Sequence, residues 1–127
     1  QLTLDSASDQ IIFAGAVYDK KIVNALRFHA LFYVHGHTVG GTNPALVEAL
    51  GAGQAIIAHD NKFNRYVAKS AALYFDDEKS LDNIFDKLIN NKKLINKLRM
   101  NAKRQFLDNY QWDTIIDQYE KLLLKYL

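Results

Sequence analysis

The sequence contains no cysteine, a single proline and no long hydrophobic run. The absence of cysteine excludes disulfide bonds and thiolate metal sites, and it fits a reducing compartment. No apolar segment approaches the roughly 20 residues that a membrane-spanning helix needs. Basic and acidic residues nearly balance, and the formal net charge of +2 gives no sign of a nucleic-acid-binding protein. We therefore expect a globular protein without nucleic-acid partners.

The remaining composition is that of one domain, which we assign to residues 1–127. Hydrophobic residues make up 49% of the 127 positions and aromatic residues 12%, which is enough to bury a core. The first ten residues, QLTLDSASDQ, have neither a basic nor an apolar stretch, so they do not form a signal peptide. Because the chain has no initiating Met and a strand is expected within a dozen residues, we expect a piece of a longer protein.

Short apolar runs alternate with helical patterns through the first 75 residues. Helices are predicted at 20–30 and from Pro44, with a short polar turn or helix at 64–69. Strands are predicted at 11–15, 31–34, 55–58 and 72–75. Continuous apolar strands that alternate with helices indicate a parallel sheet covered on both faces. The fold class is therefore α/β, with a Rossmann-like parallel sheet of about four strands, flanking helices and a helical C-terminal segment.

The C-terminal half shows apolar residues at helical spacing. Three stripes, at 81–89, 94–106 and 112–126, predict three helices whose apolar sides pack on the sheet. Trp112 is expected to anchor the last helix. The final turn, 121–127, mixes Lys with Leu and Tyr, and a contact with a membrane or a partner domain is the alternative there.

The most informative stretch is HGHTVGGTNPALVEALGAG, at 35–53. It has the pattern of a strand end, a glycine-bearing loop and a helix that opens at Asn43-Pro44 and ends near Gly51 and Gly53. Such a loop directs backbone N–H groups and a helix N-terminus at one point, where an anion or a sugar hydroxyl can bind.

The polar residues of this stretch each have a functional and a structural interpretation. Glu48 lies in the second turn of the helix, where its carboxylate can accept two hydrogen bonds from a ribose diol, or can simply face solvent. Gly40 and Gly41 either make the turn or let a ligand approach the backbone. His35 and His37 lie two apart at a strand end, placed to bond a phosphate or sugar or to act in acid–base chemistry, or else to make structural hydrogen bonds.

The crevice is expected at the carboxyl ends of the strands, where open α/β sheets bind ligands. The loops after Gly15, Val34 and Ala58 should surround it together with the start of the helix at Pro44. With no cysteine and no carboxylate cluster, we expect neither a metal site nor a cofactor.

Four segments together resemble the C-terminal, donor-binding domain of GT-B glycosyltransferases: IIFAGAVYD, HGHTVGGTNPALVEALGAGQAIIAHD, FNRYV and AALYF. Within that class the chain is most similar to the family 4 retaining enzymes, particularly the bacterial rhamnosyltransferase-like members that build surface polysaccharides. The likeness covers nearly the whole chain. It implies binding of a nucleoside-diphosphate sugar and a cytoplasmic location, with a peripheral contact at the inner face of the membrane open to the parent enzyme.

The resemblance also implies roles for particular residues. Glu48 matches the second Glu of the family's E-x7-E motif, which holds the ribose, whereas Gly40 stands where the first Glu would fall. Sugar and diphosphate contacts would then come from backbone N–H groups of Gly41, Thr42 and Asn43. The loop at Ala16 and Val17 resembles the nucleobase contact. The basic residues that neutralise the diphosphate in such enzymes, and their acceptor-binding domain, would lie upstream of this chain.

Two functional hypotheses follow. The first is the donor-binding domain of a glycosyltransferase that transfers a sugar, with rhamnose as the candidate, while the isolated domain does not turn over. The second is a non-catalytic nucleotide-binding or interaction module on the same sheet, which the broken E-x7-E motif favours.

Overall fold

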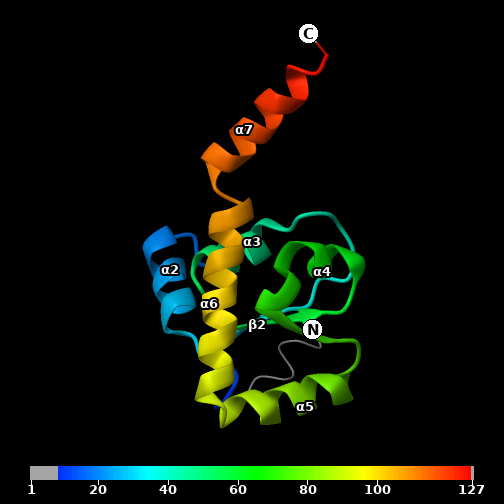
Figure 1. Cartoon of the computed structure of the whole chain (residues 1–127). Coiled ribbons are helices and arrows are strands. Elements are labelled where there is room, and N and C mark those ends of the chain that lie inside the picture. The colour runs from blue at the N-terminus through cyan, green and yellow to red at the C-terminus, as the bar shows by residue number, and fades with distance from the viewer. Residues whose placement is uncertain (1–8, 127) are drawn as a thin grey trace.

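The computed structural model describes residues 9–126, and Figure 1 shows its arrangement. Its elements in chain order are α2 (Lys20–His29), β1 (Tyr33–His35), α3 (Pro44–Gly51), β2 (Ile56–His59), α4 (Lys62–Ala68), the 3-10 turn η1 (Lys69–Ala71), β3 (Ala72–Phe75), α5 (Glu78–Ile89), α6 (Lys92–Asn109) and α7 (Trp112–Leu123). Within this part of the chain, no helix combines the length and the apolar character needed to cross a bilayer.

The sheet is parallel, with the order β1-β2-β3. Tyr33 lies opposite Ile56, which in turn lies opposite Ala72. β2 is central, and Ile56, Ile57 and Ala58 are fully buried because helices cover both faces of the sheet. The predicted α/β fold is confirmed.

The sheet has three strands rather than the expected four. Within 11–15 only Ile11 forms an isolated β-bridge, and no helix or strand follows until α2. Ile12 is 86% exposed, so this segment does not enter the core. An apolar composition favours a strand, but a strand forms only where a neighbour takes up its backbone hydrogen bonds. The prediction of a strand at 11–15 was therefore wrong.

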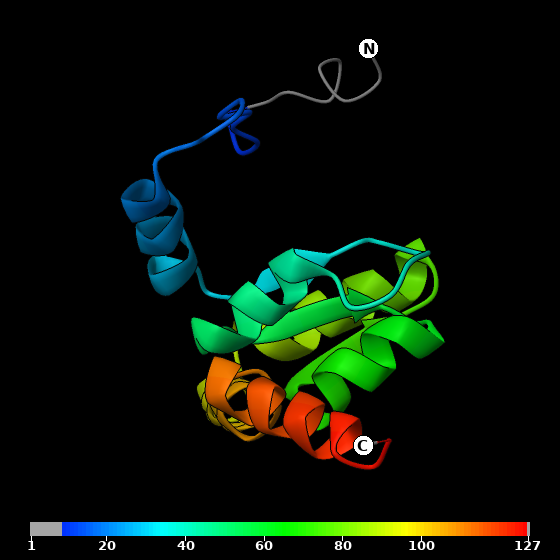
Figure 2. The same cartoon turned by 90° about the horizontal axis from the view of Figure 1, so that it is seen from above.

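Two apolar clusters hold the sheet between its helices (Figure 2). On one face, Ile56 and Ala58 pack against α3, α4 and η1 through side chains that include Leu46, Leu50 and Val67. On the other face, Ile57 packs against α5 and the first half of α6. α6 contributes to both clusters, with Ile95 and Leu98 in the second and Ala102 in the first.

The helix starts follow from the local sequence. Each helix from α2 to α6 begins after an Asp or Asn whose side-chain oxygen accepts a hydrogen bond from a backbone N–H of the first turn, which stabilises the helix start. These caps are Asp19, Asn43, Asn61, Asp77 and Asn91. The helix end predicted near Gly51 and Gly53 is confirmed, and Gly53 adopts φ 65°, which favours glycine.

The last helix differs from the prediction. α7 forms as expected, but its apolar stripe does not pack on the sheet, and α7 has no buried residue. Trp112 is 77% exposed and Tyr119 64% exposed. Figure 1 shows α7 extending beyond the layered body from the end of α6. Helical periodicity fixed the helix but did not identify what covers its apolar side.

Candidate functional site

The loop between β1 and α3 has the predicted form. Asn43 caps α3 by accepting a hydrogen bond from Ala45 N at 2.9 Å, and Pro44 occupies the first turn. Gly40 adopts φ 118°, a conformation that L side chains rarely take, so a turn here requires glycine. Gly41 and Thr42 are exposed just before the helix. The N–H groups in the first turn of α3 already donate to Asn43, so the backbone donors available to a ligand here belong to the exposed loop before the helix, next to its positive dipole end.

Glu48 forms an ion pair with Arg27 across the gap between α3 and α2. Its Oε2 lies 2.6 Å from Nη2 of Arg27, and the Glu48 side chain is 57% exposed while that of Arg27 is 19% exposed. Arg27 is fixed from its other side, since its carbonyl accepts a hydrogen bond from Gln54 Nε2 at 2.8 Å. The carboxylate is therefore positioned by a half-buried guanidinium and keeps open lone pairs for further donors.

Glu48 and Val17 line the same cleft. This cleft between α2 and α3 has a volume of about 820 Å³, and Val23, Phe28 and Val47 contribute apolar walls. Glu48, Arg27 and Lys20 supply the charged groups. A second cavity of about 790 Å³ adjoins it, with Thr42 and Pro44 on one side and Trp112 on the other. Glu48 borders both cavities, as do the apolar residues Val47 and Phe106, so its carboxylate lies between the predicted base and sugar regions.

His35 is buried at the end of β1, with 1% of its surface exposed. Its Nδ1 lies 3.1 Å from the Tyr33 hydroxyl, and its ring stacks on His37 with centroids 4.7 Å apart. Burial, together with the neighbouring His37, lowers the pKa of His35, so its neutral form is favoured near neutral pH. His35 therefore lies beneath the loop as a packed aromatic residue, and its Nε2 has no hydrogen-bond partner within residues 9–126.

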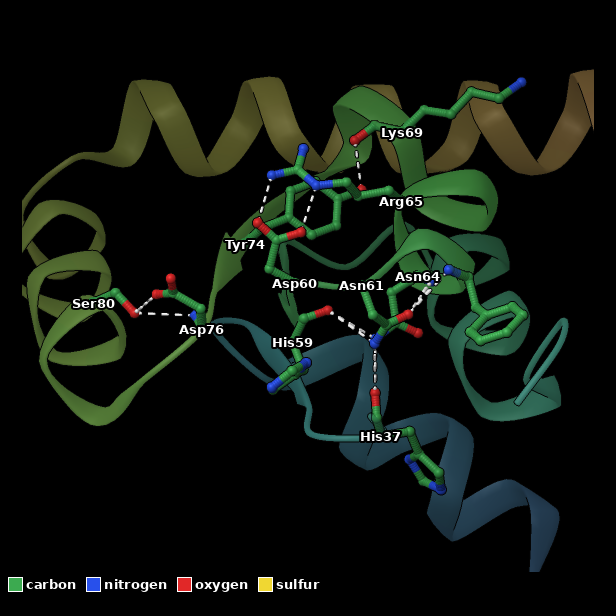
Figure 3. A network of polar contacts seen from close by, with 11 residues as sticks. His37, His59, Asp60, Asn61, Asn64, Arg65, Lys69, Tyr74, Asp76 and Ser80 are labelled. Carbon is green, nitrogen blue, oxygen red and sulfur yellow. Dashed lines mark hydrogen bonds and ion pairs between the residues drawn. The ribbon is translucent and has the colours of Figure 1, made fainter. Parts of the chain in front are cut away.

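Two asparagines connect the loop after β1 to the end of β2 (Figure 3). Asn64, which is 3% exposed, donates from Nδ2 to the carbonyls of His37 and His59, each at 2.9 Å. Asn61 donates from Nδ2 to the His37 carbonyl at 3.0 Å while it caps α4. The position of the loop after β1 is therefore set by α4, an element that follows it by more than twenty residues.

A charged group lies next to this network. Arg65 on α4 donates from Nη2 to Asp60 Oδ2 at 2.7 Å, and its guanidinium lies 4.4 Å from the ring centre of Tyr74. The hydrogen bond from Arg65 lowers the pKa of Asp60, and burial raises the pKa of Tyr74 to about 12. These side chains keep fixed protonation states across the physiological range and brace the start of α4.

Sequence reasoning missed Asn61, Asn64 and Arg65. The available signal was Asn61 directly after a predicted strand, which is the position of an N-cap. That signal would have moved the start of α4 from 64 to Lys62, where the structure has it.

The structure does not bring all four expected loops into one cavity. The cleft that holds Val17 and Glu48 is formed by α2 and α3, whereas Gly36–Val39 line a separate hollow of about 480 Å³. The loop after β2 is engaged with His37 through Asn61 and Asn64. The expected single crevice is thus divided, because the asparagines hold the loop after β1 against α4. No group of three or more His, Asp or Glu residues suited to a metal ion occurs in the described part of the chain.

The structure has a parallel three-stranded sheet with crossover helices and a cleft beside a capped helix start. This is an α/β domain, a class in which ligands bind at the carboxyl ends of the strands. The family model described as glycosyl transferases group 1 matches residues 5–105, from before α2 into α6. The chain belongs to this family. Membership implies sugar transfer from a nucleotide-sugar donor to an acceptor. No curated protein and no solved structure matches the chain.

Proposed function

We propose that this chain is the C-terminal, donor-binding domain of a GT-B glycosyltransferase of the family 4 retaining type. The observation that carries the proposal is the position of Glu48 on α3, in a cleft that it shares with Val17. A carboxylate with free lone pairs is suited to the two hydroxyls of a ribose, and a wall of apolar side chains is suited to a base.

The donor would extend from Val17 past Glu48 to the start of α3. The base lies between α2 and α3, the ribose at Glu48, and the diphosphate at the backbone N–H groups of Gly41, Thr42 and Asn43. A diphosphate is favoured there by the helix dipole and by unpaired N–H donors. His35 supports the same loop from below through its stacking on His37. Arg27 orients the Glu48 carboxylate before the donor arrives.

Gly40 stands where the family's motif has its first Glu. In this chain the transferred sugar is held through backbone groups of the loop, and we propose rhamnose as that sugar and surface polysaccharide as the product. The acceptor then binds to an N-terminal domain of the same enzyme, at the cytoplasmic side of the membrane.

A non-catalytic nucleotide-binding module is the second candidate. Its support is Gly40, which removes a carboxylate that the motif provides. The two candidates differ in one measurable respect. A protein that contains the non-catalytic module would bind a nucleotide but transfer no sugar.

Calorimetric or NMR titration of the chain with UDP, GDP and dTDP, and with their sugar conjugates, tests the donor site. We expect selective binding of one nucleotide and at least a tenfold weaker affinity for Glu48→Gln, about 1.4 kcal/mol, because the ribose loses a charged acceptor. Glu120→Gln, which makes the same change on exposed α7, is the matched control and should bind like the wild type.

Equal nucleotide affinities of Glu48→Gln and Glu120→Gln would show that Glu48 does not bind the donor. Absence of binding at millimolar ligand would contradict a donor site complete in this chain. Transfer assays on the complete enzyme, with the anomeric configuration of the product read by NMR, then separate the enzyme from the module and test retention.

A further inference from the structure

The charges of the chain are unevenly distributed. Six of the sixteen Lys and Arg residues but one of the fourteen Asp and Glu residues lie in α6, so this helix carries a formal charge of +5 while the rest of the chain carries −3. A nearly neutral protein thus concentrates its positive charge on one helix of 18 residues.

The buried side of α6 is defined by Ile95, Leu98 and Ala102. With 3.6 residues per turn, the opposite side presents six residues, which we call the basic face of α6. They are Lys93, Lys97, Met100, Lys103, Arg104 and Leu107. All six are exposed, and Met100 (73%) and Leu107 (46%) are apolar side chains among the cations. Figure 1 shows α6 running along the front of the body.

The polar residues at the edges of α6 serve the fold, and those of the basic face do not. Arg99, Asn101 and Gln105 donate to backbone carbonyls of the body at 2.8, 2.9 and 3.0 Å. By contrast, Lys93, Lys97 and Lys103 form no ion pair with any described residue. Arg104 pairs only with Asp108, at 3.6 Å and with both side chains exposed, which is a weak interaction.

We propose that the basic face of α6 binds the surface of a membrane that contains anionic phospholipids. Its lysines match the negative charge of the lipid headgroups, and each basic residue near such a surface strengthens binding by about fivefold. Met100 and Leu107 enter the interfacial region, where long apolar side chains beside cations are favoured. A nucleic acid would leave these two side chains without an apolar environment, so the lipid surface is the better match.

This inference deepens the proposed peripheral membrane contact by naming the surface, and it does not depend on donor binding. The cleft between α2 and α3 is lined by none of the six residues of the basic face. Loss of membrane binding and loss of nucleotide binding are therefore separable in experiment.

Vesicle co-sedimentation of the chain tests the proposal. The probes are phosphatidylcholine vesicles and vesicles with 30% phosphatidylglycerol. The variants are the triple substitution Lys93→Gln, Lys97→Gln, Lys103→Gln and a matched control, Lys21→Gln, Lys79→Gln, Lys87→Gln, which removes the same charge from exposed positions on α2 and α5. We expect binding only to the anionic vesicles, at least a tenfold loss for the first triple variant and less than a twofold loss for the control.

Salt and an uncharged substitution sharpen the test. Raising the NaCl concentration from 0.1 to 0.5 M should release the chain, because screening shortens the range of the attraction. Met100→Ala should weaken binding about two- to threefold at constant charge, through the lost apolar contact. Equal losses in both triple variants, absence of binding by the wild type, or tighter binding to duplex RNA than to anionic vesicles would each overturn the proposal.

Discussion

The sheet with α3–α6 and the two peripheral helices α2 and α7 differ in what their apolar residues contact. In the body, Leu50, Ile57 and Leu88 are fully buried. α2 and α7 have equally clear apolar stripes but no buried residue. Leu26 of α2 and Leu122 of α7 are 58% and 50% exposed. A helical pattern therefore predicts a helix reliably, whereas burial depends on a matching surface elsewhere in the chain.

The largest expected difference lies in truncation of a leucine. Leu50→Ala should destabilise the chain by about 3 kcal/mol, because it leaves a cavity in the cluster between α3 and the sheet. Leu122→Ala, the same change on α7, should alter the free energy of unfolding by less than about 0.5 kcal/mol. Urea unfolding of both variants measures this. A large loss in Leu122→Ala would show that α7 packs on the body.

A smaller difference is expected for asparagine. Asn64→Ala should cost about 1–3 kcal/mol, since it deprives the His37 and His59 carbonyls of their shared buried donor. Asn24→Ala, on exposed α2, should be neutral or slightly stabilising because alanine favours a helix. Amide hydrogen exchange should speed up in the loop 36–43 of the first variant only. Unchanged exchange there would contradict the role of Asn64 in holding the loop.

The smallest expected effect is a pH dependence. The pKa of His35 is lowered in the folded chain, so below pH 6.5 the unfolded state binds more protons than the folded state. Stability should therefore fall as the pH drops below 6.5. His35→Gln should flatten this part of the profile, and His29→Gln, at the exposed end of α2, should leave it unchanged. Urea unfolding between pH 5 and 7 measures the slope, and equal slopes in the wild type and His35→Gln would contradict the assignment.

Much of the fold was predictable from local patterns. The α/β class, the strand 72–75, and the helices of the C-terminal half follow from periodicity and from apolar runs. The start of α3 followed from Asn43-Pro44. The strand expected at 11–15 failed because strand formation requires a hydrogen-bonding neighbour, which composition does not specify.

The candidate site was predictable only in part. Glu48, Val17 and the loop 40–43 were named from sequence, and the structure places Glu48 and Val17 in one cleft. The partner of Glu48 was not predictable, because Arg27 lies on another helix and meets it only after the chain has folded. The same holds for Asn64, which reaches back to His37 across 27 positions.

The sequence by itself determined the elements of this protein, its membership in the group 1 glycosyltransferases, and the uneven placement of charge along α6. These depend on residue order and on interactions between near neighbours. Only the tertiary structure decided that α2 and α7 remain exposed, that Arg27 orients Glu48, and that α4 holds the loop after β1. Each of these depends on contacts between distant segments, which form when apolar burial brings the segments together.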